Sequence, residues 1–442
     1  MGPDSSDIGS LSLQTLEKNR ARALLVSVYK GGSSQKELAE EHLRELSLLA
    51  NTYGITVVNQ QICPIRQYDA ATYVTMGKLQ ELQNAAKQHQ ANLIVFDDEI
   101  SPSQQRNLEK AFGCPVIDRT EVILEVFAQR ARTKEARLQI ELAKVKYQAP
   151  RLKRLWTHLS RQHGSGGSGS AGGHTKGEGE KQIEIDRRIL KRKIDALQSE
   201  IDEVRAHRET QRSSRERSDI FCFGIIGYTN AGKSTLLNAL TGAEVFVEDK
   251  LFATLDTTTR KFILTNHQEV LLTDTVGFIR KLPHLLVAAF KSTLEEAFAS
   301  DILLHLIDVS HPMALEQADT TYEVLKELNV ENKPIITVFN KIDLVTDQSV
   351  LQQLLSKYPG AVQISAAKQI GFDKLLKAMT DEMSKKRKVI SLRIPQSEYH
   401  IFSEIKRHGS IISQEYEEND IVVTVELPAA VGKRFHKYTI CD

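Results

Sequence analysis

A glycine-rich segment in the middle of the chain has the residue types and spacing of a phosphate-binding loop. It follows the pattern G-x-x-x-x-G-K-[ST] and consists of Gly227, Tyr228, Thr229, Asn230, Ala231, Gly232, Lys233 and Ser234. The apolar run at 221–226 predicts a strand before the loop, and the run at 235–240 predicts a helix after it. In that context backbone N–H groups bind phosphate, Lys233 reaches the β- and γ-phosphates, and the Ser234 hydroxyl binds Mg²⁺.

A second motif predicts which base the nucleotide carries. An apolar strand at 335–339 leads into Asn340, Lys341, Ile342 and Asp343. A carboxylate such as Asp343 accepts hydrogen bonds from guanine N1–H and from the exocyclic amine, whereas adenine has no 2-amino group and would leave it unpaired. Asn340 can brace the loop, and the Lys341 stem can lie on the ring. A later strand brings a backbone that can approach guanine O6, at Ser365, Ala366 and Ala367. Together these motifs indicate GTP.

The segment "LLTDTVGFIR" at 271–280 supplies a candidate acid. Asp274 ends an apolar strand and has the carboxylate expected to face Mg²⁺. Thr275 and Val276 follow it, and then Gly277, whose N–H can contact the γ-phosphate. A mobile threonine should complete the Mg²⁺ shell. On chemistry alone four residues qualify: Thr254, Thr257, Thr258 and Thr259. The expected reaction is in-line attack of water on the γ-phosphorus.

Phe278 stands where many GTPases hold a glutamine that orients the attacking water. A phenyl ring has no donor or acceptor for that task, so it either packs against the next segment or swings away from the site. Both alternatives predict slow intrinsic hydrolysis that a partner accelerates. Near the phosphates, the Asn230 amide either helps to coordinate K⁺ or only braces the loop.

The elements that must position these residues follow from hydrophobic patterning. Before the nucleotide motifs, three strands (24–29, 55–62 and 92–98) alternate with helical segments, which predicts a small open α/β sheet. No glycine-rich phosphate loop accompanies these strands, so a scaffold or docking role is expected. After the nucleotide motifs, the tail offers material for a small α+β module.

Two apolar stripes predict a pair of long helices. The stripes recur at spacings of three, four or seven, at Leu124, Phe127, Ala131, Leu138, Leu142 and Val145, and then at Leu190, Ile194, Leu197, Ile201 and Val204. We interpret them as an antiparallel hairpin, with an intermolecular coiled coil as the alternative. Between them Pro150 breaks the pattern. A basic segment around Trp156, with Arg151 at its start, and a Gly-rich stretch then form either a flexible linker or a tip that binds RNA.

Bulk properties describe a soluble protein of several domains. The chain has 442 residues, 41% hydrophobic and 26% charged, with net charge +1, so no overall charge attracts nucleic acid. No apolar run is long enough to span a bilayer. Four separated cysteines indicate a reduced, cytoplasmic setting, and we expect a monomer. The expected class is α/β multidomain: a flexible N-terminus (1–20), an N-terminal α/β domain (21–120), a helical hairpin (121–217) with a Gly-rich loop (164–180), a nucleotide domain (218–385) and a C-terminal α+β domain (389–442).

The stretches "GYTNAGKSTLLN", "LFATLDTTTR", "DTVGFIRKLP" and "NKID" together resemble the HflX family of translational GTPases, over roughly residues 20 to 380. The resemblance implies a Ras-like GTPase domain that binds the large ribosomal subunit, with the hairpin reaching ribosomal RNA, and a role in splitting or rescuing stalled ribosomes. It also implies that Thr254 is the switch threonine, and adds its neighbours to the site: Phe252, Ala253, Leu255 and Asp256. Two positions depart from the family pattern: Thr257, where the family has proline, and Glu178 in the hairpin loop.

Two rival functions fit the same motifs. One is a GTPase that assists ribosome assembly or RNA modification. The other is a GTP-gated binding switch with negligible turnover.

Overall fold

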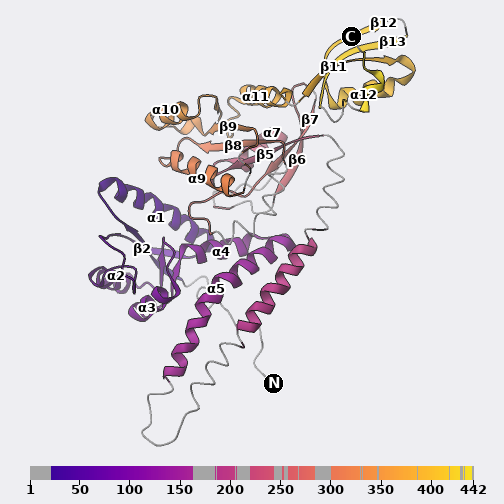
Figure 1. Ribbon diagram of the computed structural model, residues 1–442. Helices are drawn as coiled ribbons and strands as arrows, with labels where there is room; N and C mark the ends of the chain where they lie inside the picture. Colours follow the sequence, from indigo (N-terminus) through magenta and orange to yellow (C-terminus); the bar gives the residue numbers. More distant parts are fainter. Residues whose placement is uncertain are drawn as a thin grey trace, which may run out of the picture. The chain divides into compact units, whose positions relative to one another are not determined.

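A computed structural model of the chain is shown in Figure 1. It describes residues 21–162, 185, 187–204, 206, 220–242, 251–252, 257–266, 268–283, 300–328, 330, 332–345, 348–385, 387–417, 419–428, 432 and 434–440. The chain forms two compact units: Met1–Val204 with Lys281–Phe290, and Arg205–Arg280 with Lys291–Asp442. The predicted flexible N-terminus and Gly-rich loop lie outside the described residues, as do the side chains from 152 to 184.

The first unit contains a four-stranded parallel sheet. Its strands are β1 (Arg22–Tyr29), β2 (Thr56–Pro64), β3 (Leu93–Phe96) and β4 (Val116–Asp118), in the order β2-β1-β3-β4. Helices α1 (Ser33–Tyr53), α2 (Met76–Gln88) and α3 (Pro102–Phe112) connect them. The three strands predicted from the sequence are present. The sequence did not predict β4, because three buried residues are too short to show a period.

The predicted first helix of the hairpin is two helices. Leu124 and Phe127 belong to α4 (Arg119–Arg130), and a separate helix, α5 (Lys134–Gln162), begins after the break at residues 131–133. The expectation that Pro150 breaks the helical pattern is also wrong, because α5 continues through it. A proline inside a helix removes one backbone hydrogen bond and can kink the helix without ending it.

The hairpin itself is present within the first unit (Figure 1). Apolar side chains of α5 pack against those of a second helix at 187–204, in a cluster of Leu138, Leu142, Val145, Leu190, Leu197 and Ile201. The Lys193 amine lies 2.9 Å from the Glu141 carboxylate across the pair. The intramolecular hairpin therefore occupies the apolar stripes that an intermolecular coiled coil would need.

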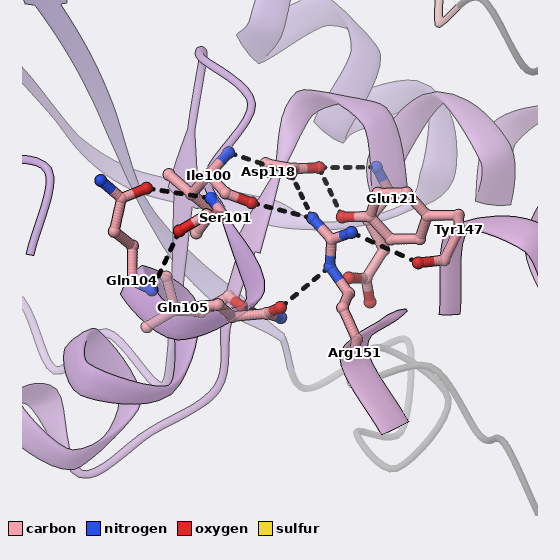
Figure 2. A network of polar contacts seen from close by, with 9 residues as sticks. Ile100, Ser101, Gln104, Gln105, Asp118, Glu121, Tyr147 and Arg151 are labelled. Carbon is pink, nitrogen blue, oxygen red and sulfur yellow. Dashed lines mark hydrogen bonds and ion pairs between the residues drawn. The ribbon is translucent and has the colours of Figure 1, made fainter. Parts of the chain in front are cut away.

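A buried polar network attaches α5 to the sheet (Figure 2). The Asp118 carboxylate, at the end of β4, accepts hydrogen bonds from the Tyr147 hydroxyl (2.7 Å), the Arg151 guanidinium (3.0 Å) and the Glu121 N–H (3.1 Å). Arg151 also donates to the Gln105 side chain (3.0 Å) on α3. Arg151 was expected among the basic residues of an RNA-binding tip. Instead it points inward, because a buried carboxylate requires a paired cation.

The second unit contains a six-stranded sheet of order β10-β9-β8-β5-β7-β6. The strands are β5 (Phe221–Gly227), β6 (Thr258–Ile263), β7 (Glu269–Asp274), β8 (Ile302–Asp308), β9 (Ile335–Asn340) and β10 (Val362–Gln363). Only β6 runs antiparallel to its neighbour. Among the described residues, the helices of this part are α7 (Lys233–Thr241), α9 (Ala314–Glu327), α10 (Gln348–Lys357) and α11 (Phe372–Ser384). The nucleotide motifs follow the carboxyl ends of β5, β7, β9 and β10, where open α/β sheets bind ligands.

A three-stranded antiparallel sheet closes the chain. It consists of β11 (Arg387–Pro395), β12 (Ser410–Glu417) and β13 (Asp420–Pro428) in the order β11-β13-β12, with α12 (Tyr399–His408) between β11 and β12 in the sequence. One face is buried: Phe402 and Ile405 of α12 pack on Leu392, Val423 and Val425. Across the described ranges, no helix is long and apolar enough to cross a membrane.

Candidate nucleotide-binding site

The phosphate-binding loop depends on two glycines that no other residue can replace without strain. Gly227 ends β5 with φ +148°, and a Cβ there would lie 2.3 Å from the Leu306 carbonyl oxygen. Gly232 precedes α7 with φ +93°, and its Cβ would lie 2.3 Å from the amide nitrogen of Asn340. Left-handed backbone and close approach both favour glycine. Between them, Asn230 also has positive φ (62°), which asparagine tolerates better than most residues.

Lys233 is the buried cation of the loop. Its amine donates hydrogen bonds to the carbonyl oxygens of Tyr228 (2.7 Å) and Gly227 (3.2 Å). Burial lowers the pKa of this amine to about 8, although the Asp274 charge opposes the shift. The Thr229 hydroxyl is also buried and has no hydrogen-bond partner among the described residues. The loop thus concentrates donors where an anion would bind.

The structure brings the two predicted Mg²⁺-directed residues together. The Ser234 hydroxyl donates a 2.6 Å hydrogen bond to the carboxylate of Asp274, which is buried at the end of β7. A hydroxyl and a carboxylate are oxygen ligands of the kind that Mg²⁺ prefers. The donor set therefore fits this ion.

The segment after β7 lies against the phosphate-binding loop. The Thr275 hydroxyl donates a hydrogen bond to the Ile225 carbonyl (2.7 Å), and Val276 follows it in the chain. At Gly277 a Cβ would come within 2.8 Å of the Thr229 Cα and 2.9 Å of the Lys233 amine. A side chain at position 277 would collide with the Thr229 backbone, so glycine is required for this close approach.

The Phe278 side chain is packed inside the protein. Its side chain is 1% exposed. Its N–H donates to the Gly227 carbonyl (3.0 Å), and its carbonyl accepts from the Thr229 N–H (2.7 Å). Of the two alternatives for this residue, the structure has the packed one.

The base-recognition motif is connected to the phosphate-binding loop through Asn340. The Asn340 amide donates to the Ala231 carbonyl (2.8 Å), and its oxygen accepts from the Ala366 N–H (2.9 Å). Asn340 thus braces two loops. Lys341 has φ 61° and forms an ion pair with Asp308 at 2.7 Å.

Asp343 is held as a carboxylate. Its pKa lies below the usual range because the Ser365 side chain donates to it and Lys368 adds a positive charge 3.2 Å away. Ile342 joins the same loop by donating its N–H to the Ile364 carbonyl (3.3 Å), and Ala367 follows in the exposed part of that loop.

Part of the predicted set lies outside the described residues: Ala253, Thr254, Leu255 and Asp256. Their neighbour Phe252 is buried, with φ 57°. Among the other candidate threonines, Thr258 and Thr259 belong to β6, and the Thr259 hydroxyl pairs with that of Thr273 at 3.0 Å. Thr254 as the switch residue stays a prediction.

Sequence reasoning missed three residues near the site. Lys368 and Asp308 pair with motif residues; Lys368 could have been found, since it follows Ala367 directly. His305 on β8 gave no signal inside an apolar run. It is fully buried, meets Tyr322 edge-on at 5.1 Å, and has its pKa lowered to about 3 by burial and by the Lys233 charge, so it is neutral.

Sequence and structure comparisons relate this chain to known GTP-binding proteins. Successive parts match family models described as "GTP-binding GTPase N-terminal" (40–128), "GTP-binding GTPase Middle Region" (130–215) and "50S ribosome-binding GTPase" (222–341). A GTPase HflX of Chlamydia pneumoniae is 48% identical over 96% of this chain and 89% of its own length. The GTPase HflX of Escherichia coli strain K12 is 39% identical over 94% and 96%. A solved GTP-binding protein of Sulfolobus solfataricus, in complex with GDP, is 25% identical over 82% of this chain and 98% of its own, with TM-score 0.42.

Proposed function

The chain belongs to the HflX family of GTPases and hydrolyses GTP, and on that premise we propose that it acts at the large ribosomal subunit, where it splits or rescues stalled ribosomes. The observation that carries the proposal is the match of residues 222–341, which hold the phosphate-binding loop, Asp274 and Asn340, to a ribosome-binding GTPase model. We place the protein in the cytoplasm as a monomer, with ribosomal RNA among its contacts.

In the proposed reaction Lys233 leaves the carbonyls of Gly227 and Tyr228 and binds the β- and γ-phosphates. Ser234 and Asp274 would hold Mg²⁺, with Thr254 as a further ligand, and the ion would supply positive charge against the phosphates. The Gly277 N–H is directed at the γ-phosphate. Asp343 accepts hydrogen bonds from the guanine edge, and the backbone at 365–367 faces guanine O6.

The position of Phe278 supports dependence on a partner. A buried ring at this position cannot orient water, and its backbone N–H and carbonyl already bond to the phosphate-binding loop. Intrinsic hydrolysis should therefore be slow until a ribosomal component supplies or positions a catalytic group.

The decisive experiment measures GTP hydrolysis by the full chain as purified large subunits are added. We expect the single-turnover rate to rise at least about tenfold, since partner-supplied groups often contribute far more. No stimulation by any ribosomal particle would favour the switch with negligible turnover. Stimulation and co-sedimentation with assembly precursors alone would favour a role in assembly.

A monovalent cation near Asn230 remains part of the proposal. The exposed, left-handed Asn230 lies next to Thr229 and Ala231 in the loop, where an added positive charge would stabilise the transition state. Hydrolysis in K⁺ should then exceed hydrolysis in Na⁺ at equal ionic strength. Equal rates would leave Asn230 with a bracing role.

A further inference from the structure

The C-terminal sheet has one covered edge and one open edge. At β11 the chain's last segment closes the edge: Thr439 bridges to Leu392, and the Ile440 N–H donates to the Ser391 carbonyl (2.9 Å). At β12, the opposite edge, the backbone of residues 411–417 bonds only to β13 among the residues that the structure describes. An open edge strand presents a row of backbone donors and acceptors to another extended chain.

The two faces of β12 differ in chemistry. Gln414 and Tyr416 pair in register with the buried Val423 and Ile421, so they lie on the side that α12 covers; yet Tyr416 is 64% exposed. Glu415 and Glu417 lie on the other side. Glu417 pairs with Arg393 at 2.7 Å, while Glu415 is exposed. A strand added beside β12 would therefore meet Glu415 and Glu417 on one face, and Gln414 and the exposed Tyr416 ring on the other.

We propose that β12 is a docking edge for an extended segment of a partner protein in which Lys or Arg alternates with apolar residues. The basic side chains would lie beside Glu415 and Glu417, and the apolar ones beside Tyr416, while the backbones form a fourth strand. No family model matched above extends beyond residue 341, so this edge lies outside what they cover.

The negative charge of β12 excludes a nucleic acid and a second copy of this chain as the occupant of the edge. The stretch 410–420 contains four acidic residues and no basic one, so it repels a phosphate backbone. A second copy pairing edge to edge would set Glu415 and Glu417 near their own copies, and like charges across a strand pair destabilise it. The chain's own C-terminal segment already covers the edge at β11.

The test uses the full chain and a fluorescein-labelled (Lys-Val)4 peptide, with (Glu-Val)4 as the control peptide, in fluorescence anisotropy. Glu415→Lys should weaken binding about tenfold, because it places like charges in contact. Glu404→Lys is the matched control: this exposed residue of α12 lies in the same module, carries the same charge change and should alter the affinity less than twofold. Amide hydrogen exchange should slow in 410–417 when the peptide is bound.

Equal weakening by both variants would reduce the effect to general charge attraction and overturn the proposal. Unchanged exchange in β12 would overturn it as well, as would dimerisation through this edge or direct binding of a labelled 12-residue poly-uridine that slows exchange in 410–417. Because the peptide assay needs no nucleotide, its outcome is independent of the proposed ribosomal function.

Discussion

At the phosphate-binding loop, the amine of Lys233 donates to two carbonyl oxygens of its own backbone and is shielded from water. Asn340 donates to the same loop and accepts from the loop that follows β10. These side chains hold the binding loops in place through neutral or charge-assisted hydrogen bonds. For a single substitution at these residues, nucleotide affinity should therefore be measured before turnover.

The low pKa of Lys233 predicts a pH-dependent affinity for GTP. Phosphates favour the ammonium form, so bound nucleotide raises a pKa that is about 8 in the nucleotide-free protein. Above pH 8, binding must therefore take up a proton, and the affinity for a fluorescent GTP analogue should fall about sixfold between pH 7.0 and pH 8.8. Lys233→Arg, which does not titrate in this range, should remove the dependence. A flat wild-type profile would contradict the assignment.

Asp343 predicts a change of base specificity. In Asp343→Asn the amide can donate to the 2-carbonyl of xanthine but meets the 2-amino group of guanine with a like donor. GTP affinity should fall about a hundredfold or more, and XTP affinity should rise. Lys368→Ala removes only an exposed ion-pair partner of Asp343 and should change GTP affinity less than about fivefold. If Asp343→Asn kept its preference for GTP, the base would lie elsewhere.

At the scale of elements, two segments are held by buried contacts that sequence periodicity does not show. The strand-like stretch around Phe278 bonds to the phosphate-binding loop through its backbone, with its ring in the core. Helix α5 is fixed to β4 by the network around Asp118, which includes Tyr147 and Arg151. For each of the two segments we predict how a substitution changes the free energy of unfolding.

Phe278→Gln should destabilise the protein by about 3 kcal/mol or more, because it removes a buried ring and buries an amide in its place. Phe278→Leu, which keeps the site apolar, should cost less. Urea unfolding of the nucleotide-free protein, followed by circular dichroism, measures both. If the glutamine variant were as stable as wild type and hydrolysed GTP faster without ribosomes, the ring would have to face the nucleotide.

Glu121 predicts how stability depends on pH near α5. Burial, and then the Asp118 charge, raise the pKa of Glu121 to about 8, so the folded protein retains a proton that the unfolded chain loses near pH 4.5. Its contribution to stability is therefore present below that pH and is lost as pH rises towards 8.

Glu121→Gln keeps this site neutral at every pH. Its unfolding free energy relative to wild type should rise between pH 5 and pH 8, by at most about 1.4 kcal/mol per pH unit. Glu37→Gln, at an exposed position of α1, serves as the control and should show no such slope. A constant difference across the range would mean that Glu121 is charged in the folded protein.

At the scale of the whole molecule, one chain carries a nucleotide site and a separate docking edge. Lys233→Ala should abolish GTP binding and nucleotide-dependent association with large subunits, because the loop loses its cation. The same variant should bind the (Lys-Val)4 peptide as wild type does. Sedimentation with and without GTP, beside the anisotropy assay, measures both properties. Loss of peptide binding as well would mean that the two sites are coupled.

The sequence by itself determined the nucleotide chemistry, because the phosphate-binding loop, Asp274 and the Asn340–Asp343 motif each depend on residue types at short spacing beside a strand. The same local rule predicted three strands of the first sheet, from their apolar periods. Only the tertiary structure decided that Phe278 packs inward, that Arg151 pairs with Asp118, and that α4 and α5 are separate. Each of these depends on what lies opposite a side chain after folding, and the partners come from distant parts of the chain. For the same reason the open edge of β12 became evident only once β13 lay between it and β11.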